Sequence, residues 1–195
     1  MKYAIIGGKI LSGKADMQPQ EGLCILVCGD TITDVVPIDE ANLKGYETIN
    51  LGGKYIMPGL INMHVHLAGN GKPQKKQRDN AKLVKKIMSS RLTRALAYKL
   101  VCSFAKTELF SGVTTIRTVG GLSDFDTRLR DEIAQGKKVG PRILAANQGI
   151  SVPGGHMAGS VAVAAENADQ AVKLVEECEK QHVDLIKLMI TGGVL

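Results

Sequence analysis

Two histidines one residue apart close the apolar segment LINMHVHL, which spans residues 60–67. Side chains alternate between the two faces of an extended strand, so His64 and His66 should point to the same side. Two imidazoles on one side can bind one cation, and zinc and other divalent transition metals accept such nitrogen ligands. An HxH pair alone also fits two hydrogen-bonded histidines at the end of a sheet. With the Pro-Gly turn before this strand included, the longer string PGLINMHVHL is a more specific pattern than the HxH pair alone.

Two further residues could take part in chemistry. Lys187 lies in the apolar segment DLIKLMITGG, between Ile186 and Leu188. A buried ammonium group is costly, so such a lysine must be paired, neutral or chemically modified, unless it extends to water at the strand end. His156 lies in the glycine-rich segment ISVPGGHMAG, where the backbone can approach a ligand closely. It could contact a substrate or lie in water.

The elements that would position these residues change in character at Pro58. Residues 2–36 read as short strands separated by glycine turns, and YETINLGGKYIMPGL adds another strand and a Pro-Gly turn. Beyond Pro58, apolar strands alternate with helical patterns, which predicts parallel βαβ architecture. The expected strands are LINMHVHL, TTIRTVGG, RILAANQG and DLIKLMITGG, and the expected helices span residues 80–110, 124–135 and 167–181.

Four such strands could form a small doubly wound sheet or half of an eight-stranded barrel. The length of 195 residues cannot decide, because a complete (β/α)₈ barrel takes about 250 residues. In both architectures, ligands bind at the carboxyl ends of the strands. We therefore expect His66, His156 and Lys187 to lie at that end of the sheet.

The formal net charge of +6 could suggest a nucleic-acid partner. However, no aromatic residues are interleaved with the basic cluster as a stacking platform requires, which favours a solvated helix and its preceding loop. The cluster comprises Lys72, Lys75, Lys76, Arg78, Lys82, Lys85, Lys86, Arg91 and Arg94. We expect neither a nucleic-acid nor a membrane partner.

The cysteines predict a reduced chain. Cys24, Cys28, Cys102 and Cys178 are too few and too scattered to cross-link it. Cys24 and Cys28 should share one face of a strand as two small buried thiols, because a structural zinc site needs a second ligand pair. The sequence shows neither a signal-peptide pattern nor an apolar run of about 20 residues, so we expect a cytoplasmic protein.

The string PGLINMHVHL resembles the first barrel strand of the amidohydrolase superfamily, which typically reads PGLIDxHxH. GVTTIRTVGG, ISVPGGHMAG and the IKxxxTGG pattern around Lys187 are similar to blocks of the subgroup that includes Xaa-Pro dipeptidases and imidazolonepropionase-like enzymes. Asn62, in the first strand, and Thr118, in the second, stand where Asp is common in the family. Because Thr118 replaces that Asp, we assign no catalytic role at the end of the second strand. Arg117 is as compatible with an inter-layer charge as with a substrate contact.

The resemblance implies an α/β fold in which residues 1–57 form part of a small β-sandwich. Residues 58–195 would form the first four βα units of a (β/α)₈ TIM barrel. It also implies one or two divalent metal ions, with zinc expected, bound by His64, His66 and Lys187. Lys187 would be carboxylated by CO₂ to N6-carboxylysine and bridge two metals, and His156 would contact the substrate.

The implied reaction is hydrolysis of an amide or peptide C–N bond by a metal-activated water. The substrate would be a small amide, a dipeptide or an N-acyl amino acid. The general base and the remaining ligands, which the resemblance places on later strands, have no counterpart here. We therefore expect a piece of a longer enzyme, a truncation, or one chain of a split enzyme.

The open strand edge predicts a homo-oligomer or association with the missing C-terminal half. A non-catalytic fragment that assembles with a complementary chain is the alternative function.

Overall fold

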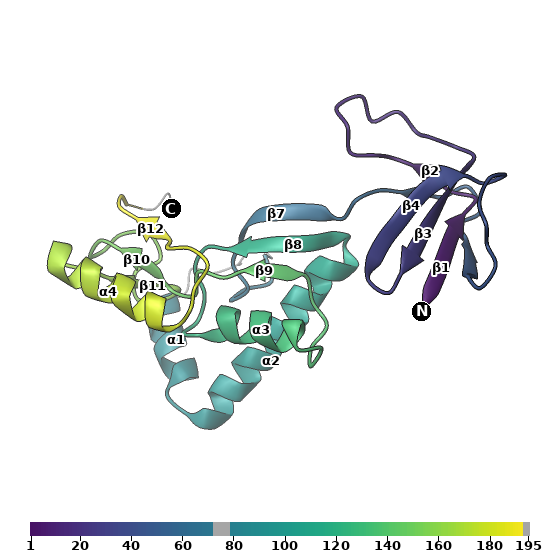
Figure 1. Cartoon of the computed structure of the whole chain (residues 1–195). Coiled ribbons are helices and arrows are strands. Elements are labelled where there is room, and N and C mark those ends of the chain that lie inside the picture. Colours follow the sequence, from purple (N-terminus) through teal and green to yellow (C-terminus); the bar gives the residue numbers. More distant parts are fainter. Residues whose placement is uncertain (72–78, 193–195) are drawn as a thin grey trace. The chain divides into compact units, whose positions relative to one another are not determined.

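The computed structural model describes residues 1–71 and 79–192. The chain divides into two compact units, Met1–Pro58 and Gly59–Leu195 (Figure 1). Pro58 is the residue at which the sequence pattern changes.

The first unit consists of strands, as the glycine-punctuated opening predicts. Its larger sheet has the order β4-β3-β1-β5, and β2 pairs with β6 in a separate parallel pair. Ala4 and Cys24 are fully buried between the strands. The strands are β1 (Lys2–Ile6), β2 (Lys9–Ile10), β3 (Leu23–Cys28), β4 (Thr31–Pro37), β5 (Glu47–Asn50) and β6 (Tyr55–Ile56). Their membership in a β-sandwich stays a prediction.

The cysteines are free, as expected, but they are not all buried. Cys24 is buried, whereas Cys28 is exposed, so the expectation of two buried thiols is wrong for Cys28. Cys28 is the last residue of β3, and Gly29 and Asp30 turn the chain into β4 at the surface. Two residues on the same face of a strand are equally buried only where neighbouring segments cover that face up to the end of the strand.

The second unit contains two parallel sheets, and the first carries the histidine pair. Strands β7 (Leu60–Val65), β8 (Val113–Thr118) and β9 (Arg142–Leu144) lie side by side in that order. Helices α2 (Arg91–Phe110) and α3 (Phe125–Ala134) pack against one face of this sheet (Figure 1). Burial alternates along β8, where Ile116 and Thr118 are inaccessible and Arg117 between them is half-buried. Arg117 therefore faces away from the helices.

The core of this unit lies between the first sheet and its helices. Apolar side chains from β7, β8, β9, α2 and α3 fill it, and fully burying one such Leu or Ile side chain contributes about 1.5–3 kcal/mol. Its most completely buried members are Leu67, Val101, Ala105, Ile116, Phe125, Leu129, Ile143 and Ala145. This packing holds the carboxyl ends of β7, β8 and β9 together.

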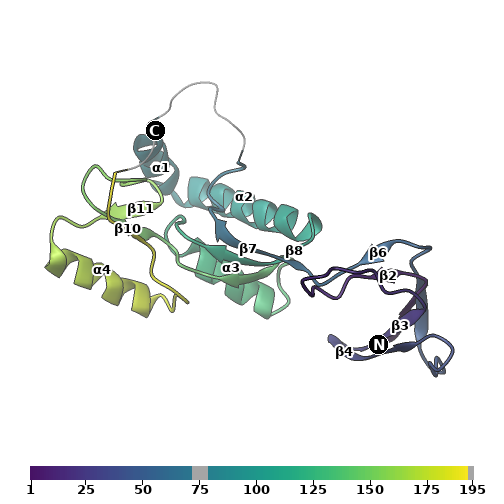
Figure 2. The same ribbon diagram turned by 90° about the horizontal axis from the view of Figure 1, so that it is seen from above.

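The second sheet continues the parallel arrangement. Its order is β11-β10-β12, with β10 (Gly149–Ser151), β11 (Ala162–Ala164) and β12 (Leu188–Met189). Helix α4 (Ala168–Lys180) lies beside this sheet in both ribbon views (Figures 1 and 2). The prediction of parallel strands alternating with helices is confirmed, while β11 was not expected.

The expected helix over residues 80–110 is two helices. Helix α1 (Asn80–Met88) ends at Ser89, and Ser90 begins α2 with an extended backbone at φ −132° and ψ 152°. The Ser90 hydroxyl accepts a hydrogen bond from Thr93 N at 3.2 Å, an N-cap that satisfies one of the free amides of the new helix. The Ser-Ser pair is the break signal that the periodicity obscured.

The expected strands RILAANQG and DLIKLMITGG are shorter than predicted. The first is interrupted after Leu144 and resumes as β10, because Asn147 adopts a left-handed backbone conformation with φ 53°. The second forms only Leu188–Met189, so Lys187 lies just before β12, and the prediction that it sits inside a strand is wrong. Gly193, in the ITGG motif, lies outside the described residues.

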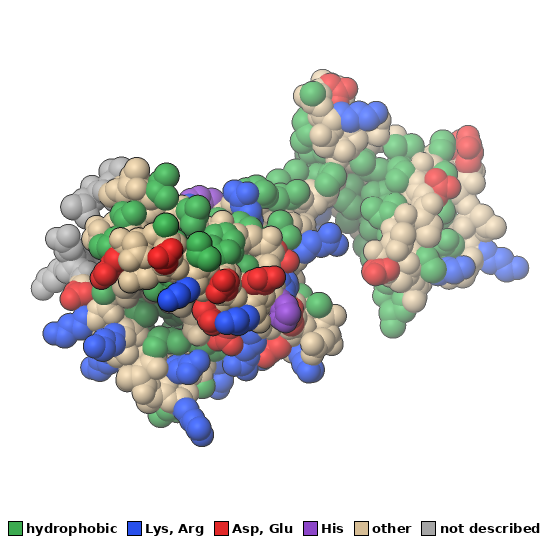
Figure 3. Space-filling view, turned by 60° about the vertical axis from the view of Figure 1, so that its left-hand side comes forward, with side chains coloured by type: hydrophobic (Ala, Val, Ile, Leu, Met, Phe, Trp, Pro, Cys, Tyr) green, Lys and Arg blue, Asp and Glu red, His purple; other side chains and the backbone are tan. Residues whose placement is uncertain are grey.

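The surface of the second unit is charged and mixed in sign. On the face seen in Figure 3, basic and acidic side chains are interspersed. The basic residues of α1 and the start of α2 are exposed, as expected for a solvated helix, while Lys72, Lys75, Lys76 and Arg78 lie outside the described residues. Within the part of the chain that the structure describes, no helix has the length and apolar character needed to cross a bilayer.

Candidate functional site

The two histidines of the HxH motif lie close together at the end of β7. His64 is in the strand, and His66 follows its last residue, Val65. Their ring centroids are 5.3 Å apart, with an interplanar angle of 67°. Two imidazoles bound to one tetrahedral zinc ion have centroids about 5 Å apart, given Zn–N distances of about 2.0–2.1 Å. The spacing of the two rings therefore fits a shared ion.

The His66 ring is oriented by the backbone. Its Nδ1 lies 2.9 Å from the carbonyl oxygen of Gly120, just beyond the end of β8. A carbonyl oxygen only accepts, so Nδ1–H donates and Nε2 keeps its lone pair. This arrangement, in which the second ring nitrogen is held by a carbonyl, is typical of metal-binding histidines. The sequence analysis did not single out Gly120, although the Gly-Gly pair after the strand was its signal.

A side chain at Gly120 would be strained. Its φ is 137°, and a Cβ there would lie 3.2 Å from Cε1 and Nδ1 of His66. The close approach of the backbone to the imidazole therefore favours glycine.

Lys187 lies in the segment that leads into β12. Its backbone carbonyl accepts a hydrogen bond from Ile150 N at 2.8 Å, and its side chain is half-buried. A Cβ on Gly149 would lie 3.4 Å from Lys187 Cγ, so this glycine leaves room for the lysine stem. Among the described residues, no carboxylate forms an ion pair with Lys187.

Several basic side chains affect the pKa of His64. Desolvation, followed by the positive charges of His66, Lys187, Arg117 and His156, holds the pKa of His64 below its ordinary value of 6.5. All four neighbours are basic residues, and they come from four separate segments. A lowered pKa favours the neutral imidazole at pH 7, which is the form that binds metals.

The sequence left the roles of two of these neighbours, His156 and Arg117, open. His156 is exposed in the loop between β10 and β11, where its carbonyl oxygen accepts a hydrogen bond from Ser151 Oγ at 3.2 Å. Arg117, which we left without a role, donates from Nε to the carbonyl oxygen of Met63 at 2.8 Å. Both side chains are near enough to His64 to affect its charge.

These residues provide part of a metal-binding set. Over residues 1–71 and 79–192, no three histidine, cysteine, aspartate or glutamate side chains gather as a metal site would require. Two imidazoles are available, and no carboxylate joins them in the part of the chain that the structure describes, so an anionic ligand would come from a carboxylated Lys187 or from another segment. The donor set fits a divalent ion on the strength of the His66–Gly120 hydrogen bond and the ring spacing.

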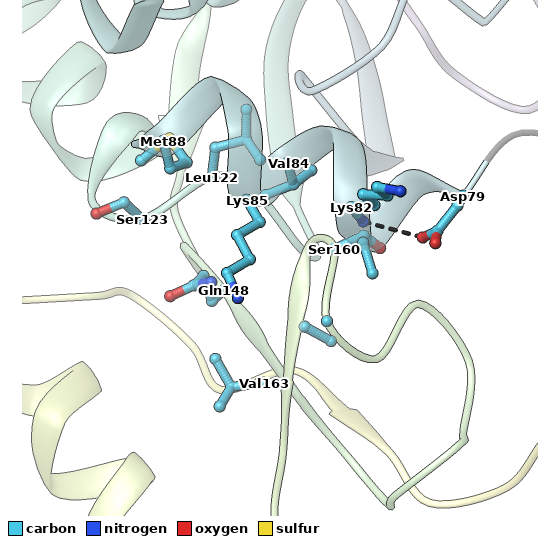
Figure 4. Close-up of a pocket in the computed structure, with 13 residues that line it drawn as sticks. Asp79, Lys82, Val84, Lys85, Met88, Leu122, Ser123, Gln148, Ser160 and Val163 are labelled. Atoms are coloured by element: carbon cyan, nitrogen blue, oxygen red, sulfur yellow. Dashed lines mark hydrogen bonds between the residues drawn. The ribbon is translucent and has the colours of Figure 1, made fainter. Parts of the chain in front are cut away.

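A cavity in the second unit lies apart from this cluster. It has a volume of about 800 Å³ and lies between α1 and the segments that follow β8 and β9 (Figure 4). Its lining is largely apolar, with Lys85, Ser123, Gln148 and Ser160 among its polar residues. None of His64, His66, His156 and Lys187 lines it, so it is not the candidate metal site.

Known proteins show the same architecture. Solved structures that resemble the chain include a Bifidobacterium longum protein with a provisional prolidase assignment (31% identity, TM-score 0.76), which covers 98% of this chain. A Xaa-Pro dipeptidase with bound methionine is 28% identical with TM-score 0.79, and an amidohydrolase is 22% identical with TM-score 0.81; each covers 100% of this chain. No curated protein matches the chain.

The chain spans less than half the length of these relatives, covering 41%, 48% and 48% of the three structures. The model of the amidohydrolase family matches residues 55–195, which is more than half of the chain and includes every candidate site residue. The chain therefore belongs to the amidohydrolase family.

Proposed function

We propose that this chain carries the first metal ligands of a binuclear hydrolase that cleaves amide or peptide C–N bonds. The observation that carries the proposal is the close pairing of the His64 and His66 rings at the carboxyl end of β7, a strand of a parallel sheet. Lys187 and His156 support it, because both contribute to the lowered pKa of His64. Family membership supports a hydrolase and favours it over the alternative of a non-catalytic fragment. Amidohydrolases generally use divalent metals, which agrees with the neutral imidazole pair.

We also propose that the second unit is the first half of a (β/α)₈ barrel and that the first unit belongs to a β-sandwich. The parallel order β7-β8-β9 and the parallel pairs of β10 support the barrel. Apolar side chains at the free strand edges support completion by further strands, from the same protein or another copy. Ile61 is 63% exposed on β7, and Ile190 is 74% exposed just after β12.

Each residue has a proposed role at the site. His64 and His66 bind through neutral imidazole, and His66 does so through Nε2, because Nδ1 donates to Gly120. The neutral amine of Lys187 attacks CO₂ and loses a proton, which gives an anionic carbamate. The basic residues around His64 favour that anion, since they supply positive charge without a carboxylate among the described ion pairs. A divalent ion bound there supplies Lewis acidity and a lowered pKa for water.

The substrate class is proposed from the relatives and from charge. A Xaa-Pro dipeptidase is among the similar structures, which supports a dipeptide or N-acyl amino acid. His156, exposed on a glycine-rich loop, contacts the substrate, and the positive surroundings suit its carboxylate.

The proposal is tested by metal uptake of the purified chain. We expect bound zinc by elemental analysis, with His66→Ala and Lys187→Ala each losing most of it. His182→Ala and Lys173→Ala are matched controls, because both residues are exposed and lie outside the cluster. Bicarbonate should increase zinc uptake by the unmodified chain and not by Lys187→Ala. Equal zinc content in all variants, or none in the unmodified chain, contradicts the proposal.

A further inference from the structure

One peptide group lies between His66 and Asn147. The carbonyl oxygen of Gly120 accepts from His66 Nδ1 at 2.9 Å, and the N–H of Gly121 donates to the carbonyl oxygen of Asn147 at 2.7 Å. This C=O and this N–H belong to the same planar peptide unit, so the direction of one fixes the direction of the other. The orientation of the His66 ring therefore depends on where the Asn147 backbone points.

Both the oxygen and the nitrogen of the Asn147 side-chain amide form hydrogen bonds. Its Oδ1 accepts from Thr127 N at 3.0 Å. Its Nδ2 donates to Thr127 Oγ1 at 3.0 Å and to Gln181 Oε1 at 2.8 Å. Both donors of the amide and its acceptor are thus used. Asn147 is 1% exposed, so the loss of these bonds is not compensated by water.

These bonds tie two helices to the end of β9. Thr127 is in the first turn of α3, whose N-cap residue Asp124 makes no side-chain cap bond, so Asn147 supplies the missing acceptor. Gln181 is the C-cap residue of α4. Asn147 itself has φ 53°, a conformation that asparagine tolerates better than most residues. The side-chain bonds hold that backbone conformation, and with it the carbonyl that accepts from Gly121.

We propose that Asn147 is a positioning residue for His66, acting through the Gly120–Gly121 peptide group to keep the proton on Nδ1 and the lone pair on Nε2. The proposal rests on the proposed function where it treats His66 as a metal ligand. A purely structural role, in which Asn147 only caps α3, would affect stability and leave the His66 tautomer unchanged.

The test compares the unmodified chain with Asn147→Gly. Glycine keeps the positive φ and the backbone carbonyl but removes Oδ1 and Nδ2. Imidazole ¹⁵N shifts in ¹H–¹⁵N spectra, assigned with His66→Ala, report the tautomer at a pH where the ring is neutral. We expect Nδ1–H alone in the unmodified chain and a mixture in Asn147→Gly. Binding of Co²⁺, followed by its absorption, should weaken by about 10–100-fold, as for other residues that orient a ligand.

Two further variants separate positioning from stability. Ile143→Val removes a buried methyl group from β9 without touching the hydrogen bonds, so it should lower stability and leave the tautomer and Co²⁺ affinity unchanged. Thr127→Val removes one partner of Nδ2 and serves if Asn147→Gly does not fold; a smaller change of the same kind is expected.

The outcomes distinguish this proposal from the metal site itself. An Nε2–H tautomer in the unmodified chain, or an unchanged Nδ1–H tautomer in the folded variants Asn147→Gly and Thr127→Val, overturns the positioning role. A tautomer change together with no Co²⁺ binding by the unmodified chain supports the positioning role and contradicts the proposed function.

Discussion

Asp184 and Ala145 bind each other through two hydrogen bonds. Asp184 N donates to the Ala145 carbonyl oxygen at 2.8 Å, and Asp184 Oδ2 accepts from Ala145 N at 2.8 Å. Arg130 Nη1 also donates to Asp184 Oδ2 at 2.8 Å and to the His182 carbonyl oxygen at 2.9 Å. The segment that leads to Lys187 is thereby fixed to the end of β9 and to α3.

Replacement of Asp184 should destabilise the fold. Asp184→Ala leaves the N–H of the fully buried Ala145 without an acceptor, so we expect a loss of about 1–3 kcal/mol in the free energy of unfolding. Asp184→Asn keeps an oxygen for Ala145 N and should lose less. Urea denaturation of both variants measures the difference. Equal losses would mean that the ion pair with Arg130, and not the hydrogen bond from Ala145 N, accounts for the lost stability.

Replacement of Gly120 should affect both stability and metal binding. Gly120→Ala places a Cβ 3.2 Å from the His66 ring and forces a non-glycine residue to φ 137°. We expect a loss of about 1–3 kcal/mol in stability and weaker Co²⁺ binding. Gly136→Ala is the control, since Gly136 also has a positive φ of 70° but nothing within 4 Å of an added Cβ. If both variants bind Co²⁺ equally well, the contact between Gly120 and His66 has no role in binding.

Replacement of Gly149 should act on Lys187. A Cβ there would lie 3.0 Å from Met189 Cε and 3.4 Å from Lys187 Cγ, so Gly149→Ala must displace one of these side chains. We expect reduced, bicarbonate-dependent zinc uptake with little change in the His66 tautomer. Zinc titrations with and without bicarbonate test this. Unchanged zinc uptake would show that the added Cβ displaces only the Met189 side chain and leaves Lys187 in place.

Asp126 should make stability depend on pH. Asp126 is 1% exposed, and its Oδ2 has no hydrogen-bond partner among the residues that the structure describes. Burial raises its pKa from 3.8 to about 6, against the opposing effect of the hydrogen bond with Thr118. Because the folded chain holds this proton more tightly, the stabilising contribution is present below pH 3.8 and is lost as pH rises through about 6. The shift of about two pKa units corresponds to about 3 kcal/mol.

Asp126→Asn isolates this contribution, because the amide does not titrate in that range. We expect the stability of the variant relative to the unmodified chain to increase between pH 4 and pH 7, since only the unmodified chain must then bury a charge. Urea denaturation across this range gives both curves. Parallel curves would mean that the pKa of Asp126 is the same in the folded and the unfolded chain.

The sequence by itself determined the features that depend on local periodicity. Alternation along residues 60–67 brought His64 and His66 to one side, and apolar periodicity bounded by glycine or polar residues located α3, α4 and the parallel strands. The family, too, followed from strings such as PGLINMHVHL. Each of these depends on neighbours within a few residues.

Only the tertiary structure decided how those elements meet. The acceptor of His66 is the carbonyl oxygen of Gly120, just beyond the end of β8. The residue that holds this peptide group is Asn147, between β9 and β10. The break at Asn147 is also held by long-range hydrogen bonds to Thr127 and Gln181, which local propensity does not encode. Such bonds form only when packing brings distant segments within about 3 Å, so their partners cannot be read from the order of residues.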